Sequence, residues 1–133
     1  MSKIFKIGVI GLSLLLLGCD KNGEISKPIT DGTYSGTFTV TYGSEKNTGV
    51  TTVKFENGKY TCTGNPNRIP AGGSGTYSIN GNKITFRDEN IWTAEFNWRL
   101  ILNGEYDFTF DGKKLKFSTG TDGNHYEYNL KKQ

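Results

Sequence analysis

Hydrophobic and polar positions alternate along most of the chain after residue 32. In Tyr34–Tyr42, an aromatic, aliphatic or glycine residue stands at every second position, and the residues between them are all serine or threonine. Tyr126, Tyr128 and Leu130 repeat the pattern near the end of the chain. A period of two predicts strands that bury one face and expose the other.

Asn-Gly and Asp-Gly pairs separate several of these segments, and such pairs favour the two-residue turns of β-hairpins. A turn at Asn57-Gly58 would place Phe55 opposite Tyr60 and Val53 opposite Cys62, so that apolar residues share one face. Turns at Asn80-Gly81 and Asp111-Gly112 would in the same way pair Tyr77 with Ile84, Gly75 with Phe86, Phe108 with Leu115 and Tyr106 with Phe117.

The segment Trp92–Leu102 fits two structures. Apolar residues occupy six alternating positions in it, which predicts a strand, whereas Asp88-Glu89-Asn90 in front of it would suit the start of a helix. We favour the strand, because a segment that can pair with it follows at once. A bulged three-residue turn over 103–105 would then pair Leu102 with Tyr106.

The chain after residue 32 is therefore expected to be all-β, with eight or nine antiparallel strands in up-and-down order. A flat sheet of this size would leave its apolar face in water and both edges unpaired. Closure into one barrel removes both problems, and the prevalence of local hairpins favours a barrel over a two-sheet sandwich. A chain of this length suffices for one hydrophobic core and is too short for two folded domains.

Residues 1–18 have a different composition from the rest of the chain. Lys3 and Lys6 precede an uncharged apolar run over residues 7–17, which is too short to cross a bilayer and is typical of a cleavable signal peptide. The run ends in Leu16-Leu17-Gly18-Cys19, which resembles the lipobox of bacterial lipoproteins. The resemblance implies cleavage before Cys19 and acylation of that residue, which would anchor the protein to a membrane.

This interpretation divides the chain into a lipoprotein signal peptide over residues 1–18, a lipid-anchored flexible tether over 19–31 and a barrel over 32–133. The tether is polar and contains glycine and proline without alternation. The expected location is the bacterial cell envelope, with the outer membrane favoured over the inner. Asp20 does not decide on which membrane face the protein lies. An acidic residue after the lipidated cysteine resembles an inner-membrane retention signal in some Gram-negative bacteria, whereas other lineages use acidic residues there for export to the surface. An ordinary secretory signal with a chance cysteine is the alternative.

Removal of the signal peptide changes the charge of the protein. The full chain has a formal charge of +3, and loss of Lys3 and Lys6 lowers it to +1, which gives no electrostatic case for binding nucleic acid. The lysines in 113–116 and 131–132 are interpreted as solvated strand edges. Cys62 would be the only cysteine without a lipid, so no disulfide is expected, and we interpret Cys62 as a small buried apolar residue.

The first strand opens with Gly32-Thr33-Tyr34, where lipocalin-like barrels often have Gly-x-Trp, and the meander Tyr34–Leu130 covers nearly all of the mature chain. The domain thus resembles the lipocalin-like (calycin-type) small β-barrels, especially those of bacterial envelope lipoproteins. The resemblance implies an up-and-down barrel that binds a small, often apolar, molecule in its cup.

The sequence leaves open whether the barrel has room for such a molecule. An eight-stranded barrel is either filled by its side chains or holds one small ligand. We expect a largely filled interior with at most a shallow pocket at one mouth, although many tyrosines would suit a polar-lined pocket. The aromatic residues predicted to point inward are Tyr34, Phe38, Tyr42, Phe55, Tyr60, Tyr77, Phe86, Phe96, Trp98, Tyr106, Phe108, Phe110, Phe117, Tyr126 and Tyr128.

Two loops are the best candidates for a binding mouth. Residues 64–74 form the longest predicted connection, and residues 88–92 place an isoleucine and a tryptophan where a turn is usually polar. Arg68 and Trp92 are the predicted contact residues, together with Tyr34 and Trp98. In the alternative interpretation, these loops only plug the end of the barrel.

No motif for catalysis is recognisable in the sequence. The only histidine, His125, is predicted to face outward, and no zinc-protease, serine-hydrolase or phosphate-binding motif occurs. Asp88 with Glu89, and Asp122 with Asn124, are interpreted as turn formers and not as calcium ligands. The protein is therefore expected not to be an enzyme, and neither a cofactor nor a metal is predicted.

The barrel is expected to be monomeric and membrane-anchored, and two functions lead for it, ahead of a third, an enzyme, that would require titratable residues converging in a cavity. The first is binding of a small, apolar or aromatic molecule at one mouth, which predicts an open pocket near Trp92 and Arg68. The second is that of a protein-interaction or inhibitor lipoprotein, in which the loops of a filled barrel grip an envelope or secreted partner. An exposed apolar patch on the loops would favour the second.

Overall fold

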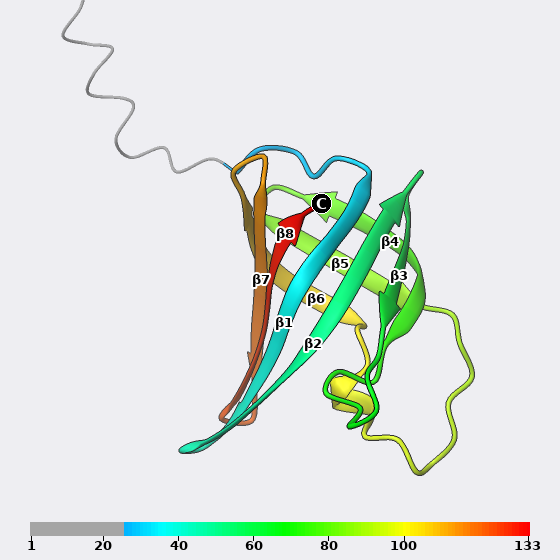
Figure 1. Ribbon diagram of the computed structural model, residues 1–133, viewed down its shortest axis with the longest axis vertical. Helices are drawn as coiled ribbons and strands as arrows, with labels where there is room; N and C mark the ends of the chain where they lie inside the picture. Colours follow the sequence, from blue (N-terminus) through cyan, green and yellow to red (C-terminus); the bar gives the residue numbers. More distant parts are fainter. Residues whose placement is uncertain (1–25) are drawn as a thin grey trace, which may run out of the picture.

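The alternating segments pair in sequence order and close into a barrel of eight strands in the computed structural model, which describes residues 26–133 (Figure 1). Each strand pairs antiparallel with the next, and β8 returns to pair with β1. The predicted all-β, up-and-down barrel is thereby confirmed. The strands are β1 (Gly32–Tyr42), β2 (Glu45–Glu56), β3 (Lys59–Thr63), β4 (Gly73–Asn80), β5 (Lys83–Asp88), β6 (Gly104–Phe110), β7 (Lys114–Thr121) and β8 (Asn124–Lys132).

The two ends of the barrel differ in their connections. We call the end at which β1 begins and β8 finishes the base; the short β2–β3, β4–β5 and β6–β7 turns lie there too (Figure 1). The opposite end, which we call the loop end, carries the β1–β2 and β7–β8 turns and two longer connections, 64–72 and 89–103. The second of these, and not the first as predicted, is the longest connection among the described residues.

Aromatic rings fill the inside of the barrel. The ring of Phe86 is central, since its centroid lies 4.8 Å from that of Tyr60, 5.2 Å from that of Phe117 and 5.7 Å from that of Tyr106. Tyr128 stacks on Phe117 with centroids 4.6 Å apart. All five side chains are buried. The crowded interior therefore agrees with the expectation of a largely filled barrel.

One of the three predicted hairpin registers is confirmed. Phe55 lies opposite Tyr60, and Asn57 and Gly58 both have positive φ angles, as a two-residue turn of this type requires. The other two registers were wrong by two residues: Tyr77 lies opposite Phe86, and Phe108 lies opposite Phe117.

The β6–β7 turn shows why its register differs. The carboxylate of Asp111 accepts hydrogen bonds from the backbone N–H groups of Lys113 and Lys114, at 2.8 and 2.7 Å, so Asp111 precedes the turn and does not form its centre. These hydrogen bonds lower the pKa of the Asp111 carboxyl group. Because the shift is of two residues, every side chain keeps its predicted face.

The predicted strand over Trp92–Leu102 was wrong, as was the bulged turn after it. β5 pairs directly with β6, and the intervening residues form a loop that contains a short 3-10 helix, Trp98–Leu100. Leu100 and Leu102 are buried at the loop end of the barrel, whereas Trp98 is 63% exposed. The apolar residues of this segment thus cover the end of the barrel without lining its wall. The predictions that Phe96 and Trp98 point inward fail for the same reason.

Residues 26–31, the last part of the predicted tether, pack on the base of the barrel. The backbone N–H of Lys27 donates to the carbonyl of Phe110 at 2.9 Å, and the Tyr34 hydroxyl donates to the carbonyl of Thr30 at 2.7 Å. Ile29 packs against the core. The folded part of the chain therefore includes Ser26. The predicted signal peptide, Cys19 and the first part of the tether lie outside the described residues.

Candidate functional site

The inside of the barrel carries hydroxyl groups but no charged side chain among the described core residues. Burial raises the pKa of the Tyr60, Tyr106 and Tyr128 phenols well above their ordinary value, so all three are neutral at any physiological pH. The Cys62 thiol forms a 3.4 Å contact with the Thr51 hydroxyl, and burial raises its pKa to about 11. Cys62 is thus a protonated core residue with little nucleophilic character.

The buried tyrosines differ in whether their hydroxyls are partnered. Tyr60 donates to the carbonyl of Leu102 at 2.6 Å, which ties β3 to the loop 89–103. The hydroxyls of Tyr126 and Tyr128 form no hydrogen bond of ordinary geometry among the described residues, although the Arg99 guanidinium lies near the first and the weakly bonding Cys62 thiol near the second. An unpartnered buried hydroxyl costs about 1 to 3 kcal/mol.

We therefore expect opposite effects from two equivalent substitutions. Tyr128→Phe should raise the free energy of unfolding by about 1 kcal/mol, because it removes an unpartnered hydroxyl. Tyr60→Phe should lower it by about 1 to 2 kcal/mol, because it breaks the bond to Leu102. Urea unfolding followed by circular dichroism measures both. A loss of stability in Tyr128→Phe equal to that in Tyr60→Phe would show that the Tyr128 hydroxyl has a partner, such as the Cys62 thiol or a buried water.

Asp88, at the end of β5, organises the start of the loop 89–103. Its carboxylate accepts hydrogen bonds from the backbone N–H of Ser74 at 3.0 Å, from Asn90 Nδ2 at 2.7 Å and from Trp92 Nε1 at 2.6 Å. The backbone N–H of Asp88 donates in turn to Asn103 Oδ1 at 2.8 Å, which brings the two ends of the loop together. The indole of Trp92 is thereby held in one orientation.

The two loops that the sequence proposed for a mouth do meet at the loop end. The guanidinium of Arg68, from 64–72, lies 4.1 Å from the ring centroid of Phe96, from 89–103. Arg68 also lies 3.6 Å from the carboxylate of Glu95. The ring of Phe96 in turn contacts the ring of Trp92 edge to face, with centroids 4.9 Å apart. Arg68, Phe96 and Trp92 thus form a continuous stack.

A groove of about 440 Å³ lies beside this stack. Ile91, Trp92 and Phe96 form its apolar wall, and Asn90 lies next to them. The facing wall consists of residues 71–74 and of Thr61 and Cys62 on β3. Gly72 and Gly73 are buried, and the carbonyl of Gly72 accepts from the backbone N–H of Leu102 at 2.9 Å. The groove is therefore lined by apolar side chains together with the polar side chains of Thr61, Ser74 and Asn90.

The predicted contact residues fall into two regions. Trp92 lines the groove, and Arg68 reaches it through Phe96. Trp98 belongs to the same loop but is not in the groove, and its Nε1 donates to the carbonyl of Thr93 at 3.4 Å. Tyr34 is completely buried and bonded to residue 30 at the base, at the opposite end of the barrel. The structure therefore brings two of the four together.

Sequence reasoning missed Asp88 and Phe96 as parts of the site. Asp88 was interpreted as a turn former, and Phe96 was placed inside the barrel. A signal for Asp88 was present, because an acceptor followed at two and four residues by the donors Asn90 and Trp92 favours a loop closed on its own carboxylate. Nothing comparable marks Phe96, whose position depends on a loop distant in sequence.

Comparison of the chain with protein-family models, with curated proteins and with solved structures found no match. Within residues 26–133, no three His, Cys, Asp or Glu side chains are grouped so that they would hold a metal ion. No helix in that part of the chain has the length and apolar character to span a membrane. His125 is exposed, 3.4 Å from Glu127.

Proposed function

We propose that this protein is a lipid-anchored envelope lipoprotein that binds a small, apolar or aromatic molecule in the loop-end groove, without catalysis. The observation that carries the proposal is the groove itself, with Trp92 and Phe96 on one wall. Its volume of about 440 Å³ falls within the range of ordinary ligand pockets, which is roughly 300 to 1,000 Å³. The barrel serves as a rigid support for the two loops.

The order of the groove in the free protein supports binding. Asp88 fixes the Trp92 indole, and Arg68 covers one face of the Phe96 ring. A ligand would therefore meet aromatic surfaces that are already oriented, which lowers the entropy lost on binding. The polar side chains of Thr61, Ser74 and Asn90 supply the few polar contacts that orient a ligand in an apolar pocket.

The eight-stranded up-and-down order also supports our assignment of the domain to the lipocalin-like barrels, which the Gly32-Thr33-Tyr34 start suggests. In this proposal the ligand lies at the mouth and not inside, because aromatic rings occupy the interior. The proposed location in the cell envelope depends on acylation of Cys19. Mass spectrometry of protein purified gently from its own envelope would report the acyl group on Cys19 and any ligand that stays bound.

Binding can be tested with N-phenyl-1-naphthylamine, an uncharged aromatic probe whose fluorescence rises in apolar sites. We expect saturable binding that weakens about tenfold or more in Trp92→Ala and in Phe96→Ala, since an aromatic contact of about 1.4 kcal/mol corresponds to a factor of ten. Trp98→Ala is the matched control, because it removes the other tryptophan of the same loop without touching the groove. Equal losses in Trp92→Ala and Trp98→Ala would contradict the proposal.

A protein partner is the second candidate, and a specific observation favours it. Ile91 is 98% exposed and Trp98 is 63% exposed, on one loop above a filled interior. Large apolar side chains in such positions are common at protein interfaces. This function predicts that Trp98→Ala weakens capture of a partner from the envelope by the anchored protein, while binding of the naphthylamine probe stays unchanged, because Trp98 does not line the groove.

A further inference from the structure

Lysines gather at the base of the barrel, although they come from three parts of the sequence. Lys114 and Lys131 lie directly opposite each other on β7 and β8, and the backbone N–H of Lys132 donates to the carbonyl of Lys113 at 2.8 Å. The Nζ atom of Lys27 lies against the turn between β6 and β7. We call these five residues the lysine cluster.

No lysine of the cluster forms an ion pair with a carboxylate among the described residues, and neighbouring acids offset only part of its charge. Every ion pair among residues 26–133 involves a cation outside the cluster. The acids nearest to the cluster are Asp111, whose carboxylate bonds to the backbone and also interacts electrostatically with Lys114, and Asp31, which bonds to the backbone N–H of Asn57, so two negative charges stand against five positive ones. Glu56 is paired with Lys54. The base therefore carries a net positive charge.

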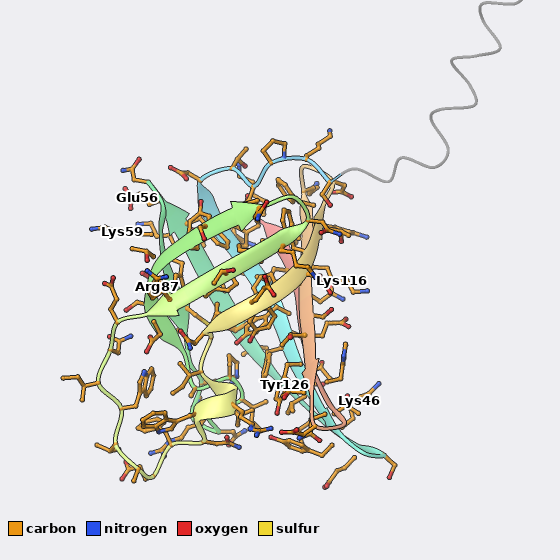
Figure 2. All side chains as sticks on the ribbon, turned by 180° about the vertical axis from the view of Figure 1, so that it is seen from behind. Lys46, Glu56, Lys59, Arg87, Lys116 and Tyr126 are labelled. Atoms are coloured by element: carbon orange, nitrogen blue, oxygen red, sulfur yellow. The ribbon has the colours of Figure 1, made fainter. Side chains whose placement is uncertain are left out.

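The loop end has the opposite character. Figure 2 shows Lys46 at that end, far from Glu56 and Lys59 at the base. Lys46 is accompanied there mainly by acids, and both arginines of the loops are paired with carboxylates, Arg68 with Glu95 and Arg99 with Asp122. The remaining acids of this end include Glu45, Asp88 and Glu89. The small net charge of the mature chain thus conceals a separation of charge along the barrel axis.

The chain reaches the barrel at the same positive end. Ser26 bonds to β6 at the base, through its hydroxyl to the carbonyl of Phe108 and from the backbone N–H of Phe110. Cys19 precedes Ser26 by only seven residues in the sequence, a span of at most about 25 Å when fully extended. If Cys19 carries the lipid, as the proposed function holds, the base cannot move far from the bilayer surface.

We propose that the lysine cluster docks the base of the barrel on the anionic phospholipid headgroups of the membrane that holds the anchor. Lysines near an anionic surface attract it by about 1 kcal/mol each, an effect that reaches no further than the screening length of about 10 Å. The short connection holds the base within about 25 Å of the anchor, so the cluster can come within the screening length while the anchor stays in the bilayer. Docking orients the barrel with the groove facing away from the membrane, into water.

The test measures vesicle binding without the anchor, using the chain from Asp20 onward. This form keeps the barrel, because every core residue and every strand pair described above lies within residues 26–133. We expect it to sediment with mixed phosphatidylcholine–phosphatidylglycerol vesicles and not with pure phosphatidylcholine vesicles. Lys114→Gln with Lys131→Gln should weaken partition about 25-fold, about fivefold for each lysine.

The matched control is Lys46→Gln with Arg87→Gln, which also removes two cations without a carboxylate partner, both away from the cluster (Figure 2). Its partition should stay within about twofold of the parent, as expected for charges beyond a screening length from the surface. Equal losses in the two double variants, no preference for anionic vesicles, or binding to heparin without binding to vesicles would each overturn the proposal. None of these results depends on the groove. If the membrane-docking proposal fails, the ligand-binding proposal and its probe experiment are unaffected.

Discussion

Replacement of Phe86 by alanine is expected to lower the free energy of unfolding by about 3 to 5 kcal/mol, because the surrounding rings cannot collapse into the space left behind. Phe86 is only 1% exposed, and its ring contacts those of Tyr60, Tyr106 and Phe117, which belong to three other strands. In a closed barrel these strands are held at fixed separations, so the cavity persists. A domain of this size has roughly 5 to 15 kcal/mol of stability in total, and the loss would be a large part of it.

Urea unfolding followed by near-ultraviolet circular dichroism would measure this effect. Trp98→Ala is the control for loss of an aromatic side chain, because Trp98 is largely exposed and its removal should change stability by no more than about 0.5 kcal/mol. A cost below about 1 kcal/mol for Phe86→Ala would mean that the interior adapts to the cavity. That result would contradict the close packing of the barrel.

Replacement of Asp88 by alanine is expected to disorder the groove and to lower stability by about 2 to 3 kcal/mol, since hydrogen bonds to a charged acceptor contribute about 1.5 to 3 kcal/mol. The substitution removes the acceptor of the Ser74, Asn90 and Trp92 donors at once. Trp92 would lose its fixed orientation. We expect its fluorescence to shift to longer wavelength and the affinity for N-phenyl-1-naphthylamine to fall about tenfold or more, as in Trp92→Ala.

Asp122→Asn provides the comparison for this variant, because it removes the charge and asparagine still tolerates the positive φ angle at this turn position. Asp122 also interacts with a neighbouring side chain, Arg99 at 3.0 Å, but in an exposed ion pair, and such pairs contribute little. Stability and probe affinity should therefore stay at the level of the unmodified protein. Unchanged Trp92 fluorescence and probe affinity in Asp88→Ala would show that the groove does not depend on this carboxylate.

The barrel was predictable because each wall residue obeys a local rule. Tyr34 and Phe38 alternate with hydroxyl residues on β1, and Asn57-Gly58 determines the β2–β3 register with two positive φ angles. Where a side chain bonds to the backbone that follows it, the turn moves. The Asn-Gly or Asp-Gly dipeptide alone then predicts the wrong register. The carboxylate of Asp111 bonds to the turn that follows it, and this contact shifts the register without changing which faces are buried.

The segment after β5 was not predictable from its pattern, because alternation has two physical origins. On a strand it separates a buried face from an exposed one. In 89–103 it reflects packing against the end of the barrel, where the consecutive residues Leu100, Ile101 and Leu102 are all buried while Trp98 is solvent-exposed. Whether this segment forms a strand or a loop depends on β6, which pairs with β5 directly and leaves no place for another strand. For the same reason the sequence located the two loops of the groove but not the contact of Arg68 with Phe96.

The pairing of β1 with β8 closes the barrel with the first and the last strand of the described chain. Until β8 has been synthesised, β1 and β7 each present an unpaired edge, so the native topology cannot be completed on a growing chain. Closure is the contact with the greatest sequence separation and is expected to be a late event in folding. A chain cut short before β8 would expose both edges and would be a target for aggregation or proteolysis.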